Sequence, residues 1–256
     1  MNNLKTITLL GKGGVGKTLL SALIGKYFID QDKKVLFIDA DPARGLQTAL
    51  NVEQVKTIGE ARVEIIKTVK ISSKIEEKQN LVNIIDYLLL EALYEDPRFS
   101  LLVMGQTDTL GCYCPLNSLL RETIKSIGSE YEIIIIDAEA GIEQVNRQVV
   151  ETVAYPIIVT DNSLRGIKTS LMINDLIKKI PKMKPLQTGI IFNRVDKIEP
   201  TLLNYLPPDL KIYGHLPSDA EIAKFDLQGK SLIELTSSFS LSKIKEMMPE
   251  IDHQKS

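Results

Sequence analysis

The chain has 256 residues and an ordinary composition, with 44% hydrophobic and 25% charged residues. This length and balance predict a folded protein with a sizeable core, in a single domain over residues 1–256. The formal net charge is -2, and aromatic residues make up only 5% of the chain. A nearly neutral chain with few aromatic residues gives no support to a nucleic-acid partner or to an anionic membrane as partner.

The sequence shows no targeting or membrane-spanning segment. The first residues run straight into a strand-like stretch, without the apolar region of a signal peptide. The apolar runs, such as residues 133–136, are much shorter than the roughly 18 residues that a spanning helix needs. We therefore expect a cytoplasmic protein.

Strand-like and helix-like segments alternate along the chain. Short continuous apolar runs are typical of parallel strands buried on both faces, whereas apolar residues three and four positions apart indicate amphipathic helices. The predicted strands span residues 6–10, 35–38, 101–104, 133–136, 156–160, 189–193 and 211–213. The predicted helices span residues 19–29, 58–70, 80–93, 116–127, 165–180 and 219–225, and the C-terminal part is also predicted to be helical.

This alternation predicts an α/β fold, in which helices cover both faces of a mostly parallel sheet. The functional sites of such sheets lie beyond the carboxyl ends of the strands. Polar residues follow the predicted strands at those ends, namely Asp39, Asp41, Asp137, Asn193 and the glycine-rich loop that begins at Gly11. We expect these residues to gather at one edge of the sheet.

The glycine-rich loop matches the phosphate-binding loop (P-loop) pattern and lies between a predicted strand and a predicted helix, as that pattern requires. Its glycines allow backbone N–H groups to point inward around phosphate oxygens, and the positive end of the following helix faces the same site. Lys17 supplies a positive charge for the β and γ phosphates, and Thr18 offers a hydroxyl to Mg²⁺. We therefore predict that a nucleoside triphosphate is bound and hydrolysed at Gly11-Lys12-Gly13-Gly14-Val15-Gly16-Lys17-Thr18.

Lys12 is a second lysine in this loop, and the binding of one nucleotide does not require it. The loop resembles the deviant Walker A loop of the SIMIBI class of dimerising P-loop ATPases, which includes the nitrogenase iron protein, septum-site and partition ATPases, and arsenite and metallocluster-assembly ATPases. The resemblance implies that Lys12 reaches across a twofold axis to the partner's phosphates and neutralises charge there in the transition state. The alternative is a solvent-exposed lysine with no catalytic role.

Two further segments resemble motifs of the same class. Asp39-Ala40-Asp41-Pro42 resembles its Asp-x-Asp-Pro element, which implies that Asp41 orients or deprotonates the attacking water and that Asp39 supports the Mg²⁺ shell. Asp137 ends a four-isoleucine strand, at the place of a Walker B aspartate that holds Mg²⁺ through water. Carboxylates beside a cation are expected to have a low pKa and to be ionised. The alternative for Asp39 is a cap of a helix or turn.

Two segments late in the chain resemble the base-binding elements of this class. Asn193-Arg194 resembles the element that reads the adenine edge, and Pro217 and Asp219 resemble a Pro-x-Asp segment that lines the base. The resemblance implies ATP rather than GTP. Neither motif is specific alone, since Asn193 could simply end a strand and Asp219 could cap the helix that follows.

Cys112 and Cys114 are the two cysteines of the chain and are one residue apart. In a reducing compartment such a pair indicates a metal or redox site before a structural disulfide. An extended Cys-x-Cys presents both thiolates on one side, and the twofold axis of a homodimer would supply two more. Four thiolates suit Zn²⁺, Ni²⁺ or an iron–sulfur cluster. The alternative is two small apolar residues packed in a loop.

With these cysteines included, the chain resembles the CooC-type ATPases that help to insert nickel into carbon monoxide dehydrogenase, and equally a related maturation factor of acetyl-CoA synthase. The resemblance covers residues 6–235. It implies a nucleotide-dependent homodimer, Mg²⁺–ATP as substrate, a Ni²⁺ or Zn²⁺ site shared across the dimer and a nickel enzyme as client. The chain departs from this family at Gln144, where we expect His, and at Asp161, where we expect Glu or a similar residue. The roles of Glu139, Arg165 and Lys168 stay open.

Two other functions are compatible with the same loop. One is ATP-dependent electron transfer through a [4Fe–4S] cluster, although the nitrogenase iron protein uses two widely separated cysteines for it. The other is a MinD- or ParA-like spatial regulator that cycles on a membrane or on DNA. A C-terminal apolar stripe could serve membrane binding, but such stripes usually pack on the protein's own core. The stripe, which Pro249 interrupts, consists of Phe239, Leu241, Ile244, Met247, Met248 and Ile251.

Overall fold

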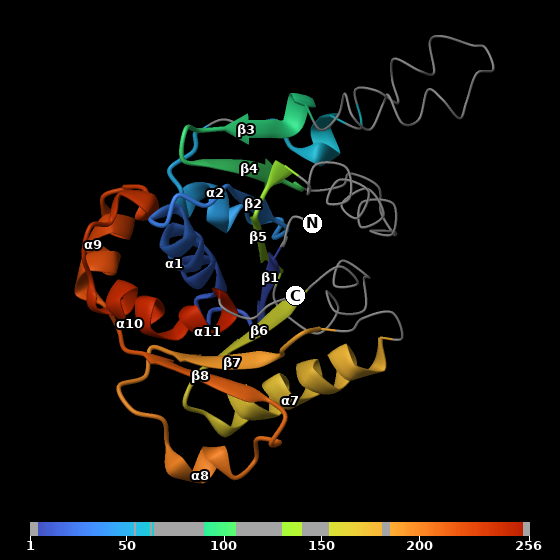
Figure 1. Ribbon diagram of the computed structural model, residues 1–256, viewed down its shortest axis with the longest axis vertical. Coiled ribbons are helices and arrows are strands. Elements are labelled where there is room, and N and C mark those ends of the chain that lie inside the picture. Colours follow the sequence, from blue (N-terminus) through green and yellow to red (C-terminus); the bar gives the residue numbers. More distant parts are fainter. Residues whose placement is uncertain are drawn as a thin grey trace, which may run out of the picture.

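The protein is described by a computed structural model over residues 5–53, 55–61, 63, 90–105, 130–139, 154–180 and 185–252. Within these residues the strands form one eight-stranded sheet in the order β3-β4-β2-β5-β1-β6-β7-β8 (Figure 1). The strands are β1 (Lys5–Gly11), β2 (Val35–Asp39), β3 (Leu93–Glu95), β4 (Phe99–Val103), β5 (Ile133–Asp137), β6 (Tyr155–Thr160), β7 (Gly189–Asn193) and β8 (Lys211–Leu216).

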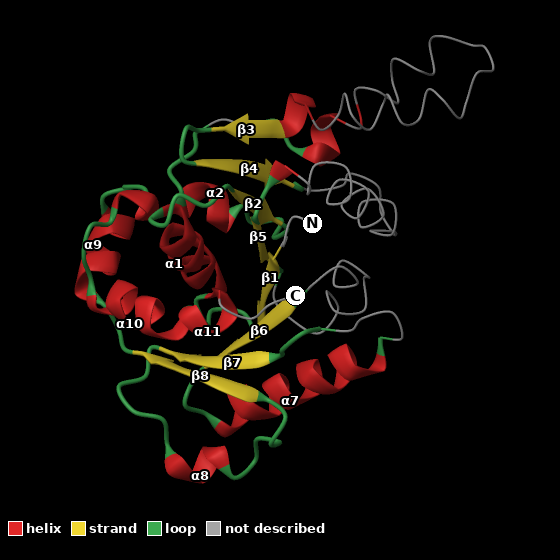
Figure 2. Cartoon of the chain, viewed as in Figure 1, coloured by secondary structure: helices red, strands yellow, loops and turns green. Residues whose placement is uncertain are grey.

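Helices lie against both faces of this sheet, as Figure 2 shows by colour. One face carries α1, α9, α10 and α11, and the opposite face carries α7 (Figure 1). The helical elements are α1 (Lys17–Ile29), α2 (Gly45–Ala49), α7 (Leu164–Lys179), α8 (Pro200–Leu203), α9 (Ala220–Leu227), the 3₁₀ helix η3 (Leu232–Glu234), α10 (Phe239–Met247) and α11 (Pro249–Asp252).

The predicted mostly parallel sheet is confirmed. Every neighbouring pair of strands is parallel except β3 and β4, which pair antiparallel at one edge. β1 lies in the middle of the sheet, between β5 and β6. After β1 the chain continues to β2 on one side of the sheet, and after β6 it continues to β7 on the other side, so the carboxyl end of β1 at Gly11 lies at a topological switch point. Ligands of open α/β sheets bind at such a switch point.

The isoleucine run of β5 explains why the sequences of these strands are continuous apolar runs. Ile133 and Ile135 pack into the core on the α1 side, whereas Ile134 and Ile136 pack into the core on the α7 side. Alternate side chains of a strand point to opposite faces, and here both faces are buried, so the strand has no polar face.

Two predictions about elements are changed or extended by the structure. Leu93, which we predicted as the end of a helix, is the first residue of β3, and Asp96 and Phe99 form the turn that leads back into β4. The strand is short and only half-buried, so its sequence shows no alternation of apolar and polar residues that would have predicted it. The short elements α2, α8 and η3 were not predicted. The predicted helix over residues 116–127, and most of those over 58–70 and 80–93, lie outside the described residues.

The C-terminal apolar stripe packs on the protein's own core, as predicted. Ile244, Met247, Met248 and Ile251 are buried in the core on the α1 side, Leu241 is also buried, and Pro249 is the first residue of α11. Phe239 is the exception, with 58% of its surface exposed. None of the helices in the described part of the chain is long and apolar enough to cross a bilayer.

Candidate nucleotide-binding site

The P-loop joins the central strand to the first helix. Gly11 ends β1 and Lys17 begins α1, so the loop lies at the carboxyl end of the sheet as predicted. Gly16 has φ 89° and caps the helix in the left-handed conformation. A Cβ at Gly16 would also collide with the Asn193 side chain, whose amide Nδ2 donates a 2.8 Å hydrogen bond to the Val15 carbonyl. Only glycine meets both conditions without strain.

Lys17 is the buried cation of the loop. Its ammonium Nζ lies 3.4 Å from the carbonyl oxygens of Gly11 and Lys12, and the residue is 7% exposed. Burial lowers the pKa of Lys17, while the carboxylates of Asp137, Asp41 and Glu139 act against that shift. An ammonium held by two weak carbonyl contacts is available to stronger acceptors such as phosphate oxygens.

Thr18 and Asp137 meet at the other side of this loop. The Thr18 hydroxyl donates a 2.6 Å hydrogen bond to Asp137 Oδ2, and the Ser21 hydroxyl lies 3.3 Å from Asp137 Oδ1. Asp137 is 1% exposed, and burial raises its pKa to about 7. Ser21 was missed in the sequence, although its position three residues after Thr18 places both hydroxyls on one side of the helix.

Asp39 stands beside Asp137, because the register of β2 and β5 pairs the two residues directly. Its carboxylate accepts hydrogen bonds from the backbone N–H groups of Gln47, at 3.0 Å, and Asp41, at 3.2 Å. Burial nevertheless raises the pKa of Asp39 to about 6. This direction is opposite to the low pKa predicted for a carboxylate beside a cation, because burial disfavours the charged form, and the low pKa beside bound Mg²⁺ stays a prediction.

Asp41 leaves the sheet in a tight turn. Its Oδ1 accepts a 2.9 Å hydrogen bond from the backbone N–H of Ala43, and the side chain is half-buried near Lys17. This turn connects β2 to α2, whose Gln47 backbone N–H donates to Asp39. The predicted positions of Asp39 and Asp41 at a strand end are thus confirmed, whereas no sequence motif indicated the role of Gln47.

A cavity of about 240 Å³ lies next to the loop on the side of β7, β8 and α9. Asp219 caps α9 through a 3.1 Å hydrogen bond from Glu221 N–H and also accepts a 2.8 Å bond from Ser240 N–H, so both of its oxygens are engaged. Arg194 Nη1 lies 3.4 Å from the Gly14 carbonyl. The lining includes every residue that we predicted to contact the base, namely Asn193, Arg194, Pro217 and Asp219, together with Gly16 and Leu19.

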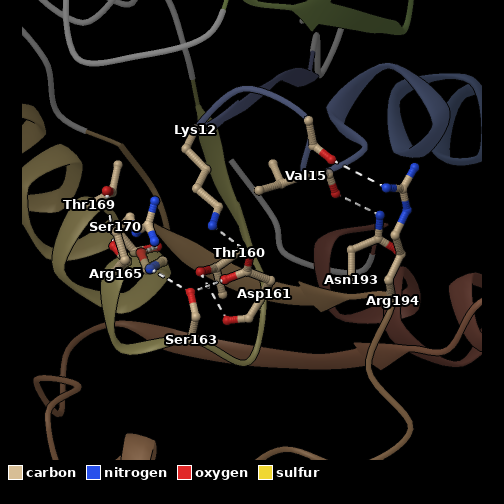
Figure 3. Close-up of polar contacts among 12 residues, drawn as sticks. Lys12, Val15, Thr160, Asp161, Ser163, Arg165, Thr169, Ser170, Asn193 and Arg194 are labelled. Atoms are coloured by element: carbon tan, nitrogen blue, oxygen red, sulfur yellow. Dashed lines mark hydrogen bonds and ion pairs between the residues drawn. The ribbon is translucent and has the colours of Figure 1, made fainter.

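Lys12 points away from this cavity, toward the loop that follows β6 (Figure 3). Its Nζ forms a 2.5 Å ion pair with Asp161 Oδ2. Asp161 follows Thr160 at the carboxyl end of β6, as the other aspartates follow their strands, but we had not included it in the predicted site. Arg165 and Lys168 lie exposed on the first turns of α7 nearby.

The predicted metal residues Cys112 and Cys114 lie outside the described residues, as does Gln144. Among the residues that the structure describes, no three His, Cys, Asp or Glu side chains gather as a metal site would require. The carboxylates near the P-loop therefore do not form a metal site by themselves, and a hydroxyl or phosphate oxygen would have to complete it.

Comparison with known proteins agrees with this geometry. Residues 4–188 match the AAA domain family. An ATP-binding protein of uncharacterised function from Methanocaldococcus jannaschii is 34% identical over 252 residues, which covers 97% of this chain and 99% of that protein. The carbon monoxide dehydrogenase accessory protein CooC of Rhodospirillum rubrum is 27% identical over 253 residues, which covers 90% of each chain.

The fold has close counterparts among solved structures. The septum site-determining protein MinD of Pyrococcus horikoshii, solved with Mg-ADP, superposes with a TM-score of 0.71 at 20% identity, over 98% of this chain and 96% of that one. The match spans the sheet and both helical layers, and at this identity it concerns the fold alone. The chain therefore belongs to the AAA domain family and has the MinD/ParA-like P-loop fold of nucleoside triphosphatases.

Proposed function

We propose that the protein is a Mg²⁺-dependent ATPase that dimerises around bound nucleotide and acts as a nickel-insertion metallochaperone for a carbon monoxide dehydrogenase or acetyl-CoA synthase. The observation that carries the ATPase part is the convergence of Lys17, Thr18 and Asp137 at the carboxyl end of the central strands. The CooC relative and the Cys-x-Cys at Cys112 and Cys114 support the metallochaperone part.

The residues present fit Mg²⁺. Thr18 Oγ1 and Asp137 Oδ2 are 2.6 Å apart, and both are oxygen ligands of the kind that Mg²⁺ prefers. Burial raises the pKa values of Asp39 and Asp137, and a bound cation would stabilise both carboxylates in their charged form. Thr18 and Asp137 would hold the ion, Asp39 would support its shell, and bound Mg²⁺ would neutralise charge on the β and γ phosphates.

The chain's own groups would perform the remaining steps. The P-loop backbone and Lys17 would bind the phosphates, and Asp41 would orient or deprotonate the attacking water, since its half-buried carboxylate lies near Lys17. The base would enter the cavity of about 240 Å³ lined by Asn193, Arg194 and Pro217. Because the Asn193 amide already holds the Val15 carbonyl, reading of the adenine edge would fall partly to backbone groups.

Dimerisation would complete the site in two ways. Lys12 would leave its ion pair with Asp161 and contact the partner's phosphates, where a fixed cation stabilises the charge that develops in phosphoryl transfer. The Cys112 and Cys114 thiolates of two protomers would together form a four-sulfur site for Ni²⁺ or Zn²⁺ as cargo. ATP binding would favour the closed, metal-holding dimer, and hydrolysis would favour release to the client.

The test is metal binding under anaerobic conditions, with ATP, ADP or no nucleotide. We expect one Ni²⁺ or Zn²⁺ per dimer, with an affinity that depends on the nucleotide, and loss of this binding in Cys112→Ser/Cys114→Ser. The control is ATP hydrolysis by the same double variant, which should stay within about twofold of the parent because neither cysteine belongs to the predicted phosphate-binding residues. Absence of metal in every nucleotide state, with hydrolysis intact, would leave a dimerising ATPase with a different cargo.

A spatial regulator is the second candidate, because the fold is shared with MinD. Membrane cycling needs an exposed amphipathic segment, whereas five of the six apolar residues in the C-terminal stripe are buried. Sedimentation with anionic vesicles in the presence of Mg²⁺–ATP separates the two functions. Nucleotide-dependent vesicle binding would favour the regulator. The electron-transfer function is recognised by a separate observation, since a protein with an iron–sulfur cluster would be brown and would contain iron.

A further inference from the structure

The ion pair between Lys12 and Asp161 lies within one protomer and outside the nucleotide cavity. Lys12 extends from the P-loop toward the loop after β6, whereas Val15, Asn193 and Arg194 lie at the other end of the P-loop (Figure 3). The two side chains are 28% and 38% exposed, so the pair is accessible to a partner or to solvent. The contact is one that the P-loop does not need in order to bind phosphate.

Asp161 is held in place by its surroundings. Its Oδ1 accepts a 2.5 Å hydrogen bond from the Ser163 hydroxyl, which in turn accepts a 3.0 Å bond from Gly166 N–H and caps α7. Asn162 fastens the same loop to the segment after β7, through a 2.8 Å bond to the Lys197 carbonyl and a 3.0 Å bond from Glu199 N–H. A carboxylate fixed in this way presents its second oxygen to Lys12 at a defined position.

Lys12, by contrast, has a long flexible stem, and within the described part of the chain its ammonium pairs with Asp161. A lysine that is to act on a neighbouring molecule must first leave any partner in its own chain. We propose that Asp161 is a positioning residue that retains Lys12 within its own protomer and thereby sets the nucleotide concentration at which the dimer closes. This inference rests on the proposed function, in which Lys12 acts across the dimer.

The size of the effect follows from the exposure of the pair. A partly exposed ion pair changes an equilibrium constant by about two- to fivefold. Each protomer breaks one such pair when the dimer closes, so the equilibrium constant for dimerisation changes by this factor once for each of the two protomers. Loss of the carboxylate charge should therefore make dimerisation easier, whereas damage to the loop would make it harder. The direction of the change separates a positioning role from a merely structural one.

The experiment measures the dimer fraction by sedimentation velocity while a non-hydrolysable ATP analogue is titrated with Mg²⁺. In Asp161→Asn, which keeps the shape and the acceptor for Ser163, we expect the half-maximal analogue concentration to fall by about two- to fivefold. Asp161→Glu keeps the charge and should stay near the parent value. Asp196→Asn is the matched control, because it removes an exposed carboxylate from the neighbouring loop while the Lys12–Asp161 pair stays in place.

Ser163→Ala is the structural control. It removes both the cap of α7 and the hydroxyl bond to Asp161 but keeps the carboxylate charge, so its melting temperature should fall while its half-maximal analogue concentration should fall less than that of Asp161→Asn. An Asp161→Asn curve that coincides with Asp196→Asn, or that shifts to higher analogue concentration, would overturn the inference. A parent protein that stays monomeric at saturating analogue would overturn the proposed function itself, and with it the inference.

Discussion

The most unusual residues of the site are Asp39 and Asp137, two carboxylates at paired positions of adjacent buried strands. Each follows an apolar run in the sequence, and their location at the same edge of the sheet could be predicted from that pattern, whereas their direct pairing follows from the strand order. Their pKa values could not be predicted, because the shifts depend mainly on burial by segments that are distant in the sequence. Without a cation, such a pair opposes folding at neutral pH.

This pair predicts an unusual pH dependence of stability. Burial raises the pKa of Asp137 from 3.8 to about 7, so the folded chain binds a proton that the unfolded chain has released. The stability that this proton contributes is fully present below pH 3.8 and is lost as the pH rises through about 7, by at most about 1.4 kcal/mol per pH unit. Thermal unfolding in EDTA, compared between the parent and Asp137→Asn, should show the difference shrinking toward low pH. A difference independent of pH between 4 and 8 would contradict the assignment.

Thr18 carries a second prediction at this scale. Its hydroxyl is 2.6 Å from Asp137, and in the proposed site both would hold Mg²⁺. Thr18→Ala should weaken Mg²⁺-dependent nucleotide binding about 10- to 100-fold, while metal-free nucleotide binding changes little because the P-loop backbone is intact. Thr169→Ala, on α7, is the matched control. Equal losses with and without Mg²⁺, measured by fluorescence of a nucleotide analogue, would count against the role.

Among the elements, the buried parallel strands and the longer helices were predictable, because each has a continuous apolar run or a helical spacing of its own. Two of the missed elements, β3 and α2, are only three and five residues long, and each depends on a neighbour: β3 pairs with β4, and α2 directs the Gln47 N–H group to Asp39. The pairing of Lys12 with Asp161 was likewise unpredictable, because these residues are far apart in the sequence and only the fold brings them together.

Helix α1 supplies a test of packing between elements. Gly25 lies in the middle of this helix, and a Cβ there would overlap the ring of Phe37, which is fully buried on β2. Alanine normally stabilises a helix by about 1 kcal/mol relative to glycine. We expect Gly25→Ala instead to destabilise the protein by about 1–2 kcal/mol, because overpacking outweighs that gain. Denaturant unfolding measures the free energy of unfolding of both single variants and of Gly25→Ala/Phe37→Leu. The double variant should lose less of this free energy than the two single variants lose in sum. An additive pair would rule out the overlap as the cause.

At the scale of the whole molecule, the sheet separates two cores that touch different helices, and the nucleotide site lies where both end. A ligand that joins α1, β2, β5 and the loop after β7 therefore stabilises the fold as a unit. We expect Mg²⁺–ATP at 100 times its Kd to raise the free energy of unfolding by about 2.7 kcal/mol, and EDTA to remove most of that gain. Calorimetry at matched nucleotide concentration measures both. A melting temperature unaffected by EDTA would contradict the assignment of Mg²⁺ to this site.

The central position of β1 in the sheet also affects how the chain folds during its synthesis on the ribosome. The strand that ends in the P-loop is made long before its partners β5 and β6, in which Ile135 and Tyr155 pair with Ile7. At normal rates of synthesis, those partners emerge on the order of ten seconds later. Until then β1 is an apolar segment with two unpaired edges, which is a hazard for aggregation. A nascent chain that stops before β5 should accordingly depend on a chaperone, whereas one that extends past β6 should already protect the P-loop from proteolysis.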